Sequence, residues 1–141
     1  MWGAIGIGVT KLVFLPPTIV NAMLYRDKCL VPNLQLLKDR VLVQDGARAH
    51  TAEDIMACLS KNGVKTLKDW PPRSPDLNPI ENLWAILARK VSDFGPTDEH
   101  QLQKYIKAVW DSYPQNTIDN IVMSFAGRVT KCIKSKGKKV K

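Results

Sequence analysis

Residues 69–84 have the sequence DWPPRSPDLNPIENLW, which joins an irregular loop to a clearly marked helix start. Asn78 is a preferred N-cap residue, and Pro79 suits the first position of a helix because its missing N–H is not needed there. The loop before them is stiffened by Pro71, Pro72 and Pro75. The stretch therefore predicts a helix that begins at Pro79, runs past Leu87 and has a fixed entry angle.

Glu81 falls in the first turn of this predicted helix. One interpretation is local, because Asn78 and Glu81 approximate a capping box and a carboxylate there favours the helix dipole. The other is functional, because the proline-rich loop would hold the carboxylate in one place, as a binding site requires. Both interpretations stay open at this point.

Asp45 is a second candidate carboxylate. It follows Val41-Leu42-Val43, which predicts a short buried strand that ends at Gln44-Asp45-Gly46. Functional groups often lie where strands of an α/β sheet end. Asp-Gly after a strand is also ordinary turn chemistry, so this residue has two interpretations as well.

Asp45 and Glu81 together form a donor set suited to a hard divalent cation such as Mg²⁺. Metal ions held in this way activate water and stabilise the leaving oxygen in phosphodiester cleavage. Arg48 and His50 follow Asp45 closely and are candidates for phosphate contact. Without a functional role, Arg48 would be an ordinary surface side chain, and His50 would be a residue just before the start of the next helix.

The rest of the chain predicts an α/β order. Residues 2–6 and 11–15 predict two strands of a hairpin, and apolar residues at helical spacing predict a helix between Asn21 and Lys38. Val64–Leu67 predicts another short strand. The full order of strand, strand, helix, strand, helix, strand and three helices predicts a mixed sheet with flanking helices.

Three helix boundaries are specific enough to test. Thr51 predicts the cap of a helix over 52–62, with Ile55, Met56 and Leu59 facing inward and Gly63 as its stop. Thr97 predicts the start of a helix that ends near Tyr113. A last helix is expected after Pro114.

Composition limits the class of protein. The chain has 141 residues, of which 45% are hydrophobic and 24% charged, as in a folded soluble domain. No apolar run approaches the roughly 18–20 residues that span a bilayer, so no membrane role is expected. Three cysteines without a CxxC spacing argue against a disulfide framework and a zinc site.

The net charge of +8 is concentrated at the C-terminus. Residues up to Asp119 hold fourteen basic and thirteen acidic side chains, whereas residues 120–141 hold seven basic and no acidic ones. Such a stretch releases counterions when it meets a polyanion. The candidates for nucleic-acid contact here are Arg128, Lys131, Lys134, Lys136, Lys138 and Lys139. The plain alternative is a solvated lysine tail.

These motifs resemble those of the mariner superfamily of DDE-type transposases. Gln44–Thr51 (QDGARAHT) resembles the motif around the second catalytic aspartate, and Asp69–Trp84 resembles the third-acid motif. Trp2–Ile5 (WGAI) resembles the second strand of the family's ribonuclease-H-like core. Ser124–Gly137 resembles the end of the catalytic domain, so the resemblance covers nearly the whole chain.

The resemblance implies an α/β, ribonuclease-H-like fold and a nuclear enzyme of DNA transposition and integration. It implies Asp45 and Glu81 as catalytic residues that bind Mg²⁺ or Mn²⁺, with DNA as the partner. In this reading the phosphate sites of Arg48 and Arg73 belong to an assembled active site, and His50 remains a candidate for phosphate contact beside Asp45.

Two departures from the family pattern qualify this expectation. The spacing from Asp45 to Glu81 is one residue longer than the commonest one. The family's first aspartate lies on a central strand before the Trp-Gly segment, and that strand is absent here. We therefore expect a partial catalytic domain over 1–137 with a basic tail over 138–141, inactive alone.

Three alternatives follow from these departures. In the first, the chain is the C-terminal part of a transposase catalytic domain and is active only when the missing N-terminal segment supplies the absent strand; a homodimer is a further candidate partner. In the second, the chain is a non-catalytic module that binds nucleic acid through its basic tail. The third is a protein-interaction remnant without a DNA role. Whether the chain is itself an enzyme stays open.

Overall fold

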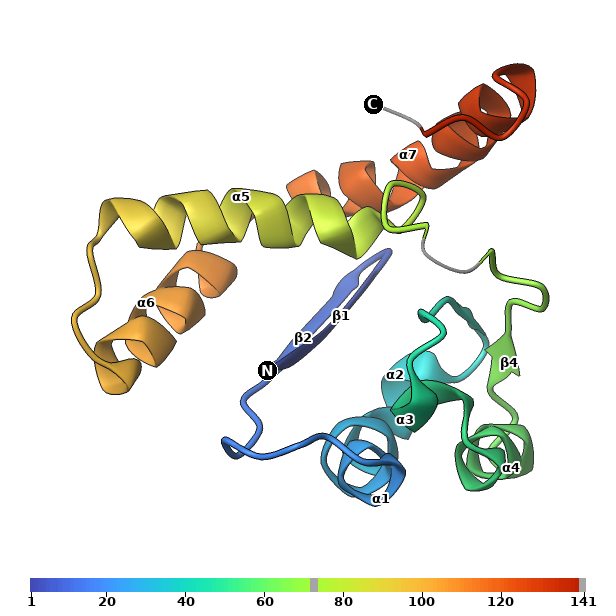
Figure 1. Cartoon of the computed structure of the whole chain (residues 1–141), viewed down its shortest axis with the longest axis horizontal. Helices are drawn as coiled ribbons and strands as arrows, with labels where there is room; N and C mark the ends of the chain where they lie inside the picture. Colours follow the sequence, from blue (N-terminus) through green and yellow to red (C-terminus); the bar gives the residue numbers. More distant parts are fainter. Residues whose placement is uncertain (72–73, 140–141) are drawn as a thin grey trace. The chain divides into compact units, whose positions relative to one another are not determined.

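A computed structural model describes residues 1–71 and 74–139 (Figure 1). The chain divides into two compact units: unit 1 comprises Met1–Phe14 and Pro75–Lys141, and unit 2 comprises Leu15–Ser74. Each unit contains its own buried side chains.

Unit 1 begins with an antiparallel hairpin of β1 (Trp2–Gly6) and β2 (Val9–Val13), in which Trp2 faces Val13. The predicted hairpin is confirmed, although its second strand begins two residues earlier than expected. Gly8 has φ of +71°, which suits a residue without a Cβ. Asp119 accepts hydrogen bonds from the Gln115 side chain at 2.8 Å and from the Gly8 amide at 2.9 Å, and these bonds lower the pKa of its carboxyl, the Gln115 bond most.

Three helices complete unit 1: α5 (Pro79–Asp93), α6 (Glu99–Asp111) and α7 (Gln115–Lys134). The predicted start of α5 at Asn78-Pro79 is confirmed. The predicted start of α6 at Thr97 is wrong, because Asp98 is the N-cap and its side chain accepts a bond from the Gln101 amide.

The core of unit 1 lies between α5 and α6, and the hairpin packs on α5 and α7 (Figure 1). Its buried members are Leu83, Leu87, Val91, Ile106, Val109 and Trp110. Those on α5 recur at i, i+4 and i+8, so they form one stripe of the helix. Helix α5 is therefore packed on the core from Leu83 to Val91, directly after the turn that carries Glu81.

Unit 2 opens with one helical stretch made of four different segments. They are α1 (Ala22–Tyr25), a π-helical turn (Arg26–Leu30), a 3₁₀ turn (Val31–Asn33) and α2 (Leu34–Leu37). Proline at position 32 has no N–H for the helical ladder, and Asn33 instead bonds the Cys29 carbonyl through its side chain. Burial raises the pKa of the Cys29 thiol to about 11.

The second half of unit 2 holds a parallel pair of very short strands, β3 (Val41–Leu42) and β4 (Lys65–Thr66). The expectation of a buried strand at Val41 is wrong, since this side chain is 54% exposed. In the described part of the chain β3 pairs only with β4, so its pairing is one-sided.

Two helices lie between these strands: α3 (Arg48–Thr51) and α4 (Glu53–Lys61). The predicted cap at Thr51 is wrong. Ala52 is the N-cap of α4, and the Thr51 hydroxyl donates instead to the Ala47 carbonyl. Ile55 and Leu59 are buried as predicted, whereas Met56 is 39% exposed.

The α/β class is confirmed, and the predicted order of elements holds except for the additional short helix α3. The prediction of one mixed sheet is wrong for the described residues, because the hairpin and the β3–β4 pair do not hydrogen-bond to each other. Among the described residues the strands form two two-stranded sheets, one antiparallel and one parallel. In the same residues, no helix is long and apolar enough to cross a membrane.

Candidate metal centre

Asp45 lies between β3 and α3, where its carboxylate is held by two donors. Oδ1 accepts a hydrogen bond from the Ala47 amide at 3.1 Å and lies 2.6 Å from Nδ1 of His50. An ionised carboxylate only accepts, so Nδ1 of the imidazole is the donor. The Asp45 side chain is 65% exposed. Within the described residues both hydrogen bonds of the carboxylate end on Oδ1, and the side chain is mostly exposed, so Oδ2 is available to a cation.

Gln44 and Tyr25, two residues of unit 2, hold His50 in place. The Gln44 side chain donates from Nε2 to the His50 carbonyl at 3.0 Å, and Tyr25 donates from its hydroxyl to Oε1 of Gln44 at 2.8 Å. The Tyr25 and His50 rings lie 4.3 Å apart, centroid to centroid. Tyr25 is 1% exposed, so this arrangement rests on the core of unit 2.

Arg48 is exposed at the first position of α3. The structure thus brings Asp45 and His50 together and leaves Arg48 at the surface. Phosphate contact by Arg48 or His50 stays a prediction. Arg73 lies outside the described residues.

Glu81 is exposed in the first turn of α5. The side chain of Asn78 accepts from the Ile80 amide at 3.4 Å, and the Asn78 carbonyl accepts from the Glu81 amide at 3.2 Å. These bonds use N-terminal amides that the helix itself leaves unsatisfied. The backbone position of Glu81 is therefore set by a capped helix.

Arg128 braces the motif that contains Glu81. From α7 its Nη1 donates to the Asp76 carbonyl at 3.2 Å and to Oδ1 of Asn82 at 3.0 Å, while Nε donates to Ser124 at 3.1 Å. Contact of Arg128 with nucleic acid stays a prediction. The bracing role was missed because it joins positions 46 and 52 residues apart.

The remaining basic candidates are exposed at and beyond the end of α7: Lys131, Lys134, Lys136, Lys138 and Lys139. Lys136 has φ of +55° and ends the helix together with Gly137. No acidic residue lies among them, so their charge is unopposed locally.

Asp45 belongs to unit 2 and Glu81 to unit 1. Their approach within metal-bridging distance therefore stays a prediction. The described residues contain no group of three His, Cys, Asp or Glu side chains that could hold a metal ion.

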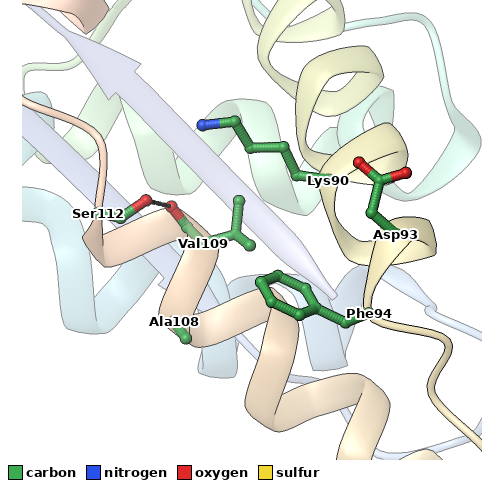
Figure 2. A pocket seen from close by; sticks show the side chains of 6 residues that line it. All are labelled: Lys90, Asp93, Phe94, Ala108, Val109 and Ser112. Atoms are coloured by element: carbon green, nitrogen blue, oxygen red, sulfur yellow. Dashed lines mark hydrogen bonds between the residues drawn. The ribbon is translucent and has the colours of Figure 1, made fainter.

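A pocket of about 300 Å³ lies elsewhere in unit 1, between α5 and α6 (Figure 2). Lys90, Asp93 and Phe94 line it from the end of α5, and Ala108, Val109 and Ser112 line it from the other side. Its lining includes one carboxylate, so the pocket does not offer the paired acids that the metal chemistry requires.

Comparisons with known proteins define the class. Residues 17–103, which include both candidate acids, match the model of the DDE superfamily endonuclease family. The chain belongs to this family, and its relatives identify it as catalytic-domain sequence of the Tc1/mariner kind of transposase.

Two relatives carry this assignment. The chain is 37% identical over 102 residues to the transposable element Tc3 transposase of Caenorhabditis elegans, covering 71% of this chain and 31% of that one. It is 36% identical over 97 residues to the Tcb2 transposase of Caenorhabditis briggsae, covering 69% and 35%. The chain thus spans about a third of the length of these relatives.

Solved structures support the fold. The Mos1 transposase catalytic domain, determined with raltegravir and Mg, superposes with a TM-score of 0.77 at 20% identity, covering 94% of this chain and 71% of that chain. The corresponding structure with Mn gives a TM-score of 0.78. The chain therefore has the α/β fold of that catalytic domain, which supports the ribonuclease-H-like fold implied by the sequence motifs.

Proposed function

We propose that this chain supplies the second and third carboxylates of a metal-dependent site for DNA cleavage and strand transfer. One observation carries the proposal: Asp45 follows β3 with one oxygen open to solvent, and Glu81 stands in the capped first turn of α5. These are the positions to which the motifs of the family assign its second and third acids.

The residues fit a hard divalent cation. Carboxylate oxygens are the ligands that Mg²⁺ and Mn²⁺ prefer, and the open Oδ2 of Asp45 needs no rearrangement to bind one. A bound metal ion would activate water or a DNA 3′ hydroxyl for attack on phosphorus. Asp45 and Glu81 would hold the ions, while exposed Arg48 would orient a phosphate beside them.

The proposal includes the expectation that the 141 residues do not cleave DNA by themselves. The family uses an acidic triad, and only two of its acids map onto this chain. The first carboxylate then comes from an N-terminal transposase segment. A DNA substrate also implies a nuclear location.

We predict no nicking of supercoiled plasmid by the isolated chain with Mg²⁺ or Mn²⁺, because two acids give incomplete coordination for in-line phosphoryl transfer. Agarose gel analysis over several hours measures this. Metal-dependent nicking by the chain that disappears in Asp45→Ala would contradict the expectation and would show that another carboxylate completes the site.

A chimaera tests the proposed function itself. Residues 17–103 of this chain would replace the matching residues of Tc3 transposase, whose own remaining sequence completes the catalytic domain. We expect metal-dependent cleavage of DNA that carries the Tc3 element, and loss of cleavage to background in Asp45→Asn and in Glu81→Gln.

Two exposed acids provide the matched controls: Asp54→Asn in unit 2 and Asp93→Asn in unit 1. Both variants should cleave like the unmodified chimaera, since neither residue belongs to the proposed site. Circular dichroism confirms that each protein is folded. A folded chimaera that cleaves equally well with Asp45→Asn or Glu81→Gln would refute the proposal.

A second function, non-catalytic binding of nucleic acid, is favoured by the basic end of the chain. Five exposed lysines lie within residues 131–139 with no acid among them. Lysine ammonium groups contact phosphates as point charges and do not recognise bases. This function is compatible with the first and does not need a metal.

We predict weak, sequence-independent duplex binding with a log–log salt slope of about −4, since four or five phosphate contacts each contribute about −0.9. Changing Lys136, Lys138 and Lys139 to Gln should flatten the slope by about 2–3 units. Fluorescence anisotropy at several salt concentrations measures both quantities.

Three exposed lysines elsewhere serve as the control with the same change in net charge: Lys61, Lys65 and Lys104 to Gln. The log–log salt slope of duplex binding by this control should stay close to that of the unmodified chain. Equal slopes for the two triple variants would show that the tail is merely solvated and that net charge alone drives the binding.

A further inference from the structure

The carboxylate of Asp45 has an asymmetric environment. Both hydrogen bonds end on Oδ1, one from the Ala47 amide and one from Nδ1 of His50. Two donors on one oxygen restrict the rotation of the carboxylate and turn the other oxygen outward. The imidazole is the second contact that holds the Asp45 side chain in one χ1 rotamer, and this rotamer determines where Oδ2 points.

The imidazole is suited to this role because it is less exposed than the group it holds and packs against buried residues. The His50 side chain is 21% exposed, against 65% for Asp45. Its ring lies against the buried ring of Tyr25, and its carbonyl is held by Gln44, which the Tyr25 hydroxyl fixes in turn. The chain of contacts thus runs from the core of unit 2 to the candidate metal ligand.

We propose that His50 is a positioning residue that holds the Asp45 carboxylate so that its second oxygen is presented to a metal ion. The inference rests on the proposed function of Asp45 as a metal ligand. It assigns His50 a partner within the protein, whereas the sequence motif suggested phosphate contact. Outer groups of this kind commonly contribute tenfold or more to metal affinity.

Three substitutions separate the hydrogen bond from the shape of the ring. In His50→Asn the amide nitrogen occupies the place of Nδ1, because both atoms are bonded to Cγ. In His50→Gln the amide nitrogen lies one bond further out, where Nε2 was. His50→Phe keeps an aromatic ring against Tyr25 and removes the donor.

The first measurement needs no metal. Three-bond NMR couplings to the Asp45 carboxyl carbon report whether the side chain occupies one χ1 rotamer. We expect a single rotamer in the unmodified 141-residue chain and in His50→Asn, and rotamer averaging in His50→Gln and His50→Phe. Thermal melting of each variant confirms that it is folded.

The second measurement is the Mn²⁺ concentration that half-broadens the amide signals next to Asp45. It should stay within about twofold in His50→Asn and rise about tenfold in His50→Gln and His50→Phe. If these substitutions acted through a general loss of structure, His50→Asn would weaken the Mn²⁺ response as much as His50→Gln and His50→Phe do.

Two outcomes overturn the proposal: an unchanged Asp45 rotamer and Mn²⁺ response in His50→Phe, or failure of His50→Asn to restore either one. The test is separable from the proposed function. If the unmodified chain shows no Mn²⁺ broadening at all, Asp45 is not a metal ligand, and the proposed function fails even when the couplings show that His50 fixes the carboxylate.

Discussion

Gly3→Ala should lower the free energy of unfolding of unit 1 by about 2–3 kcal/mol, because the new methyl group overpacks a rigid contact. A Cβ on Gly3 would lie 2.6 Å from Cζ2 and Cη2 of Trp84 and 3.1 Å from Cη2 of Trp110. The two indole rings pack on each other with centroids 5.3 Å apart, so neither can move away without disturbing the core. Urea unfolding followed by tryptophan fluorescence measures the loss.

Gly127→Ala is the matched control in the same unit. Gly127 lies within α7, and a Cβ there would meet nothing within 4 Å. Alanine should therefore raise the free energy of unfolding by about 0.5–1 kcal/mol, the usual difference in helix propensity. A Gly3→Ala protein as stable as the unmodified one would mean that β1 does not pack closely on these indoles.

Leu83→Ala should cost about 3 kcal/mol of the same free energy, because it removes a fully buried side chain and leaves a cavity. Leu83 is 0% exposed and packs in the core between α5 and α6. It lies two residues after Glu81, so the variant also tests whether the core holds the helix turn that carries this carboxylate. Urea unfolding again provides the measurement.

Leu102→Ala on α6 is the corresponding control, since Leu102 is 39% exposed. Its truncation should cost less than about 1 kcal/mol, as for most surface changes. Similar losses for the two leucines would contradict the assignment of Leu83 to the core.

The parts of the fold that the sequence predicts well are those set by neighbouring residues. The start of α5 depends on Asn78 and Pro79, and the hairpin depends on two apolar runs around a glycine turn. The errors arise where two local signals compete or where packing decides. Thr51 is a residue type that often caps helices. Here its hydroxyl donates to the Ala47 carbonyl, and the N-cap of α4 is Ala52.

In the candidate site, too, the features set by neighbouring residues are predicted and those set by packing are not. The positions of Asp45 after a strand and of Glu81 in a first helical turn follow from local patterns. The bond between His50 and Asp45 was missed, although the five-residue spacing across the short helix α3 is a signal that could have suggested it. Bracing of the Glu81 motif by Arg128 has no local signal, because it depends on how α7 packs beside α5.

The central claim is that Asp45 and Glu81 bind the same metal ion or pair of ions. Paramagnetic broadening by Mn²⁺ tests this in the 141-residue chain, because it detects weak binding in fast exchange. We predict that amide signals next to Asp45 and next to Glu81 broaden over the same range of Mn²⁺, that excess Mg²⁺ reverses both effects, and that Asp45→Asn abolishes both together. Broadening at Glu81 that persists unchanged in Asp45→Asn would contradict a shared site.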